Sequence, residues 1–262
     1  MTIDENAVRG AAERLRAARA ERAPCAPIRD RLPEDSLEAG YAVQEVNTRF
    51  WLDAGRVLVG RKIGLTSRAV QGQLGVNQPD YGMLFSDMAF TEAEPVPVSR
   101  LLQPRAEAEI AFVLGQDLDA AHLTVVDVID AVDYALPALE IVDSAVADWN
   151  IRIVDTVGDN ASSGLFALGT EPRPLGDFDL RLCGMTMERR GEPVATGVGA
   201  ACLGNPLTAV TWLAKKMVEV GRPLSAGDLV LSGALGPLVP VAPGDVIDTR
   251  INGLGSLRVV ME

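Results

Sequence analysis

Cysteine, histidine and aromatic residues are scarce in this sequence. It has three cysteines, Cys25, Cys183 and Cys202, and one histidine, His122. The cysteines have no paired spacing, which argues against a disulfide framework or a zinc site and suits a reducing compartment. A Ser-His-Asp triad would have to use His122, and no Gly-x-Ser-x-Gly motif accompanies it. Among the few aromatic residues, Trp149 is expected to serve packing.

An excess of basic charge and long apolar runs are also missing. The formal net charge of −12 argues against nucleic acid or an anionic membrane as a partner. No apolar run approaches the length of a membrane span, and residues 1–6 lack the basic and apolar regions of a signal peptide. We therefore expect a cytoplasmic protein. Because 48% of its 262 residues are hydrophobic, it can bury a sizeable core.

The chain changes character near Gly55. Residues 5–22 and 36–55 carry apolar side chains at helical spacing, whereas the chain beyond them consists mostly of short strand-like runs and turns. We predict a helical N-terminal subdomain over residues 1–55 and a β-rich catalytic domain over residues 56–262.

The β-rich part predicts an α+β fold with a twisted, mixed or antiparallel sheet, because strands outnumber helices and do not alternate with them regularly. A polar loop is expected at 155–164, and Asn252-Gly253 indicates a hairpin. Strands are expected at 57–64, 83–90, 95–101, 105–114, 138–142, 181–188, 193–196, 229–232, 246–251 and 257–261, and helices at 68–74, 124–134 and 205–221.

The predicted strand at 105–114 carries two carboxylates. Side chains alternate between the faces of a strand, so Glu107 and Glu109 share one face, and both faces end in apolar residues. Like charges beside a core resist burial unless they are paired or bound to a cation. Glu140 interrupts a second apolar strand. The three carboxylates suit a divalent ion with oxygen ligands, although solvated glutamates at an exposed strand end would show the same spacing.

Other polar residues lie at the ends of predicted strands or in loops. Lys62 ends an apolar strand and could pair with a substrate carboxylate, act as an acid, or extend to the surface. Asp80 lies among turn-forming residues, where capping is the simpler role. Ser162 could bind a ligand from its polar loop, and Ser232 with Gly233 permits a close approach of the backbone. Loop polarity and turn formation explain these three as well.

Six blocks of the sequence occur in the same order in a known family. Together they resemble the 2-keto-4-pentenoate hydratase (2-hydroxypenta-2,4-dienoate hydratase) family of the fumarylacetoacetate hydrolase superfamily, and the resemblance covers nearly the whole chain. The decarboxylases of 4-oxalocrotonate and the hydratases of 2-oxohept-4-ene-1,7-dioate are similar in the first blocks, whereas the last block is more like the pentenoate hydratases. The blocks are 60–67, 78–82, 103–111, 136–140, 155–162 and 232–237.

The resemblance implies a role for each candidate residue. It implies that Glu107, Glu109 and Glu140 hold Mg²⁺ or Mn²⁺, and that Lys62 and Asp80 are acid/base or substrate-orienting groups. It also implies a fumarylacetoacetate hydrolase type of core and homo-oligomerisation. The resemblance implies that Ser162 helps to bind the substrate. We expect Ser232 and Gly233 to contribute to substrate binding as well.

The activity that the resemblance implies is that of a lyase. Such an enzyme adds water to 2-hydroxypenta-2,4-dienoate or a homologue, giving a 4-hydroxy-2-oxo acid, in the catabolism of aromatic compounds, and other enzymes of that pathway are potential partners. The histidine of the superfamily's hydrolases has no evident counterpart, which speaks against C–C bond hydrolysis. The alternatives are decarboxylation of 4-oxalocrotonate, hydration of 2-oxohept-4-ene-1,7-dioate, and a non-catalytic metal-binding subunit.

Overall fold

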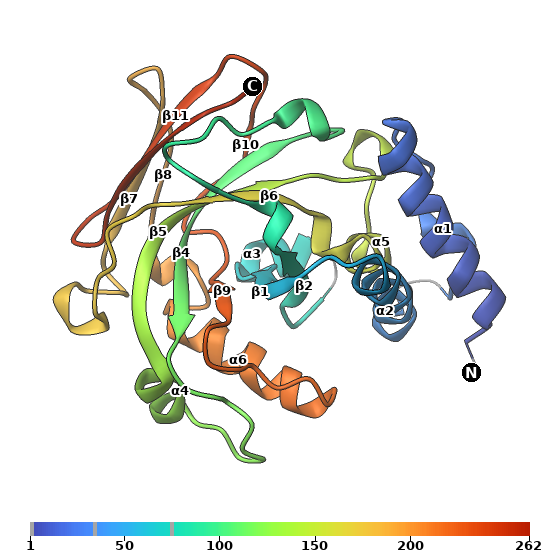
Figure 1. The fold of residues 1–262 in the computed structure, drawn as a ribbon, viewed down its shortest axis with the longest axis horizontal. Coiled ribbons are helices and arrows are strands. Elements are labelled where there is room, and N and C mark those ends of the chain that lie inside the picture. Colours follow the sequence, from blue (N-terminus) through green and yellow to red (C-terminus); the bar gives the residue numbers. More distant parts are fainter. Residues whose placement is uncertain (1–2, 34–35, 74–75) are drawn as a thin grey trace.

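The computed structural model describes residues 3–33, 36–73 and 76–262. Its larger sheet, which has eight strands among these residues, is mixed (Figure 1). The strands are β1 (Leu58–Gly64), β2 (Asp80–Phe85), β3 (Ala89–Thr91), β4 (Arg105–Leu114), β5 (Val132–Val142), β6 (Ser163–Leu168), β9 (Leu229–Leu231) and β10 (Val239–Pro240). Their order is β2-β1-β9-β4-β5-β6-β3, with β10 beside β4. β1 pairs in parallel with β9, and β3 with β6, while the other pairs are antiparallel.

The second sheet is antiparallel and lies against β5. Its strands are β7 (Gly184–Arg189), β8 (Glu192–Val198), β11 (Val246–Ile251) and β12 (Gly255–Val260), in the order β12-β11-β7-β8. The expected Asn252-Gly253 turn joins β11 to β12, and Gly253 has the positive φ of 79° that such a turn requires. Both sheets contribute to one continuous apolar core.

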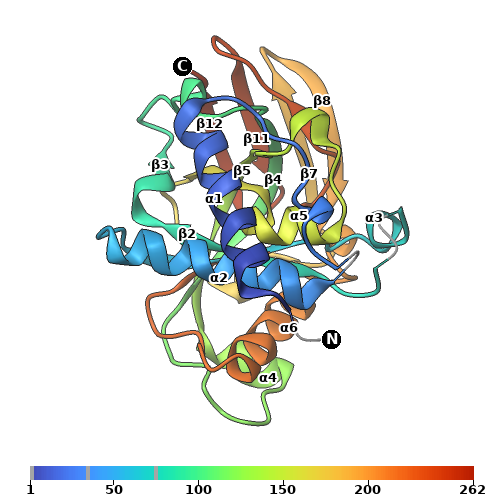
Figure 2. The ribbon, with the colours of Figure 1, turned by 90° about the vertical axis from the view of Figure 1, so that its right-hand side faces the viewer.

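Helices cover the outside of the sheets. They are α1 (Glu5–Glu21), α2 (Leu37–Asp53), α3 (Arg68–Gln73), α4 (Val125–Ala131), α5 (Ile153–Gly158) and α6 (Pro206–Glu219). α1 and α2 lie on the side away from the second sheet, and α1 crosses α2 (Figures 1 and 2). Ser36 caps α2 by accepting a hydrogen bond from the N–H of Ala39, as its place before the helix predicts.

The N-terminal helices are attached to the β-rich part through α2. The side-chain amide of Gln44 donates to the carbonyls of Tyr81 in β2 and Val157 in α5, at 2.8 and 3.1 Å. The apolar face of α1, which includes Leu15, packs into a core of its own together with Val146 and Val154. The domain boundary after residue 55 stays a prediction.

The expected α+β class with a mixed sheet is confirmed. Four local predictions were wrong. The strand expected at 83–90 is divided, because β2 ends at Phe85, residues 86–88 form a 3-10 turn and β3 begins at Ala89. The helix that begins after Thr124 ends at Ala131 because β5 starts at Val132 and pairs with β4. Residues 153–158 form α5 within the expected loop. Residues 95–101 form a single bridge and a 3-10 turn, not a strand, and residue 74, the expected end of α3, lies outside the described residues.

A membrane-crossing segment was not expected. Among the described residues, no helix combines the length and the apolar character that a bilayer crossing requires.

The close pairing of β1 with β9 gives a first prediction. A Cβ atom on Gly60 would lie 1.9 Å from the carbonyl oxygen of Leu229. We expect Gly60→Ala to lower the melting temperature by roughly 5–10 °C, because overpacking costs about 1–3 kcal/mol and each kcal/mol is worth about 2–4 °C in a domain of this size. Gly176→Ala, where nothing lies within 4 Å, is the matched control. Equal melting temperatures for the two variants by circular dichroism would contradict this packing.

Candidate metal centre and active site

Three glutamates converge where β4 and β5 run side by side. Glu107 lies directly opposite Glu140 in the antiparallel register, and Glu109 follows two residues later on the same face of β4. One carboxylate oxygen from each residue lies within 4.8 Å of the others. Glu109 and Glu140 are each 1% exposed. The structure therefore brings together the three carboxylates that the sequence singled out.

One ammonium group faces this cluster. The Nζ atom of Lys62, which lies in β1, is 3.2 Å from Oε1 of Glu140. Burial lowers the pKa of Lys62, but Glu140 and the other nearby carboxylates more than offset this and raise it above its usual value. Neither oxygen of Glu140 accepts a hydrogen bond among the described residues. Lys62 and Glu140 therefore form an ion pair that is not also a hydrogen bond.

The remaining charge of the cluster is only partly compensated. Oε2 of Glu109 accepts a hydrogen bond of 2.9 Å from the N–H of Gly233. Burial, and then repulsion by Glu140, raise the pKa of Glu107 to about 7 and that of Glu109 well above its usual value. Clustered carboxylates, some of whose oxygens accept no hydrogen bond among the described residues, are the donor set that a hard divalent ion takes, so these residues fit such an ion.

Asp80 faces the same region from the start of β2. It pairs with Gly64 in the β1–β2 register, and a Cβ atom on Gly64 would lie 2.2 Å from Oδ1 of Asp80. That oxygen has no hydrogen bond among the described residues. Burial raises the pKa of Asp80 to about 6, although the charge of Lys62 opposes the rise. Asp80 and Lys62 are therefore buried titratable groups beside the cluster.

A cavity of about 470 Å³ opens onto these groups. Its charged end includes Lys62, Asp80 and Glu107, and Ser162 also lines it. The rest of the wall is mostly apolar. It includes Ile63, Leu65, Val142, Trp149, Ile151, Ala161, Ala201, Ala234, Pro237 and Leu238.

Two of the expected substrate-binding residues are not among the lining residues described. Ser232 accepts a hydrogen bond from the N–H of Ile110 and donates one to the carbonyl of Gly233. Gly233 in turn donates its N–H to Glu109. Both residues thus lie behind Glu109 and hold its carboxylate in place.

Strained backbone surrounds the cavity. Leu65, Trp149, Ala161 and Ser162 all line it with positive φ angles of 53–56°. This conformation is unfavourable for residues with a Cβ and is found where the surroundings enforce it, often at functional sites. Trp149, expected to serve packing, is therefore a wall residue, and no pattern in the sequence indicates these angles.

Hydrogen bonds to β2 hold the segment at 160–162, which carries Ser162. The side-chain amide of Asn160 accepts a hydrogen bond of 2.7 Å from the N–H of Met83 and donates one of 2.9 Å to its carbonyl. The amide is thus used in positioning the chain. The hydroxyl of Ser162 lies 3.2 Å from that of Thr156, and the pair faces the cavity.

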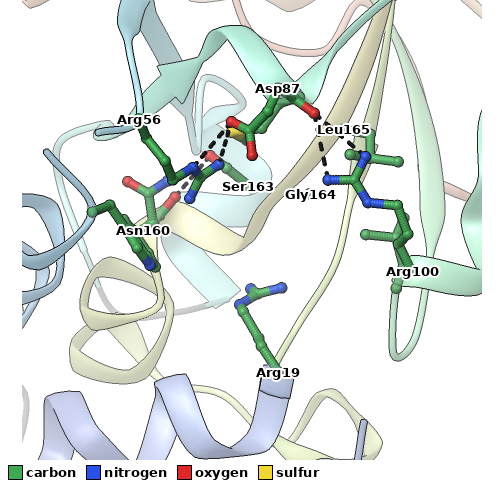
Figure 3. A pocket seen from close by; sticks show the side chains of 11 residues that line it. Arg19, Arg56, Asp87, Arg100, Asn160, Ser163, Gly164 and Leu165 are labelled. Atoms are coloured by element: carbon green, nitrogen blue, oxygen red, sulfur yellow. Dashed lines mark hydrogen bonds and ion pairs between the residues drawn. The ribbon is translucent and has the colours of Figure 1, made fainter. Parts of the chain in front are cut away.

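A second cavity, of about 280 Å³, lies on the other side of this segment (Figure 3). Arg56 donates to Oδ1 of Asp87 at 2.8 and 3.0 Å, and Arg100 makes 3.4 Å contacts with the Asp87 carbonyl. Arg19 points into it from α1 and binds Asp143 and Asp159, each at 2.8 Å. Carboxylates already pair with Arg19 and Arg56, and a backbone carbonyl accepts from Arg100, so this cavity is the weaker candidate for a ligand site.

The raised pKa of the half-buried Glu107 gives a pH-dependent prediction for the metal-free protein. A carboxyl whose folded pKa of about 7 exceeds the ordinary value of 4.5 contributes stability that is fully present below pH 4.5 and is lost as the pH rises through 7. We expect the melting temperature of chelator-treated protein to fall by roughly 5 °C between pH 5 and pH 8. Calorimetry over this pH range measures it.

The matched variants isolate the carboxyl. Glu107→Gln should flatten this fall, and Glu192→Gln, at an exposed position on β8, should leave it unchanged. If the melting temperature of the wild-type protein in chelator rises between pH 6 and pH 8, the raised pKa of Glu107 is contradicted.

Comparison with known proteins agrees with this geometry. The chain is 61% identical over 256 residues to the TodF product hydratase of Pseudomonas putida F1, covering 98% of this chain and 96% of that protein. It is 58% identical over 239 residues to a 2-keto-4-pentenoate hydratase of Paraburkholderia xenovorans, covering 91% and 89%.

A solved structure matches over the whole chain. It is the 4-oxalocrotonate decarboxylase from Pseudomonas putida G7, complexed with magnesium and adipate, at 36% identity and a TM-score of 0.95, with 100% of this chain and 99% of that chain covered. The profile of the fumarylacetoacetate (FAA) hydrolase C-terminal family matches residues 61–262. The chain thus belongs to the 2-keto-4-pentenoate hydratase family, within the fumarylacetoacetate hydrolase superfamily.

Proposed function

We propose that this protein is a hydro-lyase that adds water to 2-hydroxypenta-2,4-dienoate (2-keto-4-pentenoate), or a close homologue, to give a 4-hydroxy-2-oxo acid. The observation that carries the proposal is the cluster of three glutamates, of which Glu109 and Glu140 are buried and Glu107 is half-buried beside the cavity that Lys62 and Asp80 also line. Relatives at 56–58% identity that are named 2-keto-4-pentenoate hydratase support it. The reaction is a step in the catabolism of aromatic compounds.

Glu107, Glu109 and Glu140 would hold Mg²⁺ or Mn²⁺. The oxygens of Glu140, which accept no hydrogen bond among the described residues, and the all-carboxylate donor set support this assignment. When bound, such an ion supplies Lewis acidity that stabilises negative charge on the oxygens of a 2-oxo acid. Ser232 and Gly233 contribute by holding Glu109, and Ser162 can offer its hydroxyl to the substrate from the cavity wall.

The reaction needs several proton transfers. A proton leaves the enol oxygen and one is delivered to the terminal carbon, after which water adds at the fourth carbon and a proton at the third. Asp80, with a pKa of about 6, exchanges protons readily near neutral pH and is our candidate for moving them. Lys62 keeps its proton beside Glu140 and is suited to hold a substrate oxygen.

The second candidate is decarboxylation of 4-oxalocrotonate, which the fold match over the whole chain favours. That substrate carries a carboxylate at each end. Among the described lining residues, Lys62 is the cation, and the wall away from it is mostly apolar. A second carboxylate buried against this wall would have no cationic partner among the described lining residues, so the wall favours a substrate with an uncharged far end.

The proposal also covers the oligomeric state, the compartment and the partners of the enzyme. We infer from the family that the protein works as a homo-oligomer in the cytoplasm, alongside other enzymes of the same pathway. A non-catalytic metal-binding subunit is the remaining alternative, and Lys62 and Asp80 beside the cluster argue against it.

An ultraviolet assay of 2-hydroxypentadienoate tests the activity. We expect Mg²⁺-dependent loss of absorbance that chelator abolishes, and little carbon dioxide release from 4-oxalocrotonate. Glu107→Gln and Glu140→Gln should each lower kcat/KM by at least about 100-fold, because even residues that only support metal ligands are worth about 10–100-fold. Glu192→Gln is the exposed control. Near-normal turnover in Glu140→Gln would exclude the proposed centre.

A second pair of variants separates proton transfer from metal binding. Asp80→Asn should lower kcat by about 100- to 10,000-fold, the usual range for an acid/base group. Its Mg²⁺ affinity, measured by titration calorimetry, should stay within about three-fold of wild type, because Asp80 is outside the glutamate cluster. Asp130→Asn, on the exposed surface, is the control. Equal losses of Mg²⁺ affinity and activity in Asp80→Asn would instead make Asp80 part of the ion site.

A further inference from the structure

We propose that Arg105 receives the carboxylate of the incoming substrate at the mouth of the cavity, before the substrate reaches the glutamate cluster. This inference rests on the proposed function, because it gives that reaction a further positioning residue. It follows from where Arg105 lies, from what holds it there, and from the charge of the cavity.

Arg105 is not among the described lining residues of the cavity, but it lies next to residues that line it. It is the first residue of β4 and shares a face with Glu107, two residues further along. In the sheet it lies between Val142 of β5 and Pro240 of β10. Val142 lines the cavity, and so does Leu238, two residues before Pro240. The strand thus runs from Arg105, beside the cavity, into the charged end of the cavity.

The wall residue Trp149 holds the guanidinium. Its ring centroid is 4.4 Å from the central carbon of the Arg105 guanidinium. The indole N–H donates a hydrogen bond of 3.2 Å to the carbonyl of Gln103, and the side chain of Gln103 accepts one of 2.8 Å from the N–H of Asp148. Asp148 and Trp149 both have positive φ, at 59° and 53°. This strained turn keeps the indole under the guanidinium beside the cavity.

The donors of Arg105 are unused. Within the described part of the chain, its side chain makes no hydrogen bond or ion pair, in contrast to Arg19, which binds Asp143 and Asp159. A guanidinium held over an aromatic ring still has N–H groups that can bind both oxygens of a carboxylate. Arg105 is therefore prepared for an anion.

The charge of the cavity explains why such a group is useful. Four carboxylates, those of Asp80, Glu107, Glu109 and Glu140, face the ammonium of Lys62, which is the cation among the described lining residues. Even with a divalent ion bound, this region stays negative when all four are ionised, and the whole chain has a net charge of −12. A carboxylate substrate is repelled unless positive charge at the entrance draws it in.

Steady-state kinetics over a range of salt concentrations tests the proposal. In the Mg²⁺-loaded protein, Arg105→Gln should raise KM for 2-hydroxypentadienoate roughly five- to ten-fold and leave kcat within about two-fold, since steering changes association more than chemistry. The fall of kcat/KM with added salt should become shallower. Arg105→Lys should keep the salt dependence, and Arg250→Gln, at an exposed position on β11, should match wild type.

A binding measurement gives a readout apart from turnover. Oxalate is an unreactive anion with neighbouring carboxylate oxygens. Stopped-flow tryptophan fluorescence after mixing oxalate with Mg²⁺-loaded protein should show an association rate about five-fold lower in Arg105→Gln than in wild type, with the difference lost at high salt. Melting temperatures of the variants show whether each is folded, and Arg105→Lys keeps the test decisive if the glutamine variant is unstable.

Several results would overturn the proposal. An unchanged KM and salt dependence in Arg105→Gln would do so, as would a loss of kcat at constant KM or a defect confined to the dicarboxylate 4-oxalocrotonate. If wild-type protein turns over no 2-hydroxydienoate, the proposed function fails, while the oxalate association rate still supports or overturns the role of Arg105.

Discussion

Repulsion among buried carboxylates is the constraint on which the site depends. The pleat of β4 and its register with β5 place Glu107 opposite Glu140 and Glu109 beside them, and the sheet cannot move one away without breaking its own hydrogen bonds. Lys62 and the N–H of Gly233 compensate only part of the charge. A fold that keeps such a cluster needs a cation to complete it, which is why the arrangement supports a metal centre over a purely structural role.

The rest of the molecule keeps this rigid arrangement in contact with a shaped cavity. Arg19 in α1 binds Asp143, which follows β5, and Asp159, which precedes the strained segment at 160–162. The second oxygen of Asp159 accepts a hydrogen bond from the N–H of Ala145. The N-terminal helices thus contribute to the position of the cavity wall. If a domain boundary follows residue 55, the site would still depend on residues on both sides of it.

The sequence predicted the parts of the site that depend on local pattern. Alternation along 105–114, closed by Gly115, indicated β4 with its observed bounds and placed Glu107 and Glu109 on one face. The sequence grouped Glu140 with these two carboxylates by residue type and by the family resemblance, but the register that brings it opposite Glu107 joins two separate strands and was not predicted. For the same reason, β5 extends back to Val132, because pairing with β4 overrides the helical pattern that begins at Thr124.

Other features have no signature in the residues. The left-handed angles at 160–162 occur in an Asn-Ala-Ser run that is compatible with an ordinary loop, and surrounding hydrogen bonds enforce them. Ser232 and Gly233 were expected at the substrate, but the antiparallel pairing of β9 with β4 brings them behind Glu109. Such placements follow from tertiary contacts and become visible only in the assembled sheet.

The division of the cavity into a charged end and an apolar wall fixes how a short unsaturated keto acid can lie in it. Its carboxylate and adjacent oxygen belong with Lys62 and the glutamates, since burying them against Val142 or Leu238 would leave charge without a partner. Its hydrocarbon end gains about 0.8 kcal/mol for each CH₂ that the apolar wall takes from water. A substrate oriented in this way would have its fourth carbon between the two regions, and Asp80 and Ser162 both line the cavity.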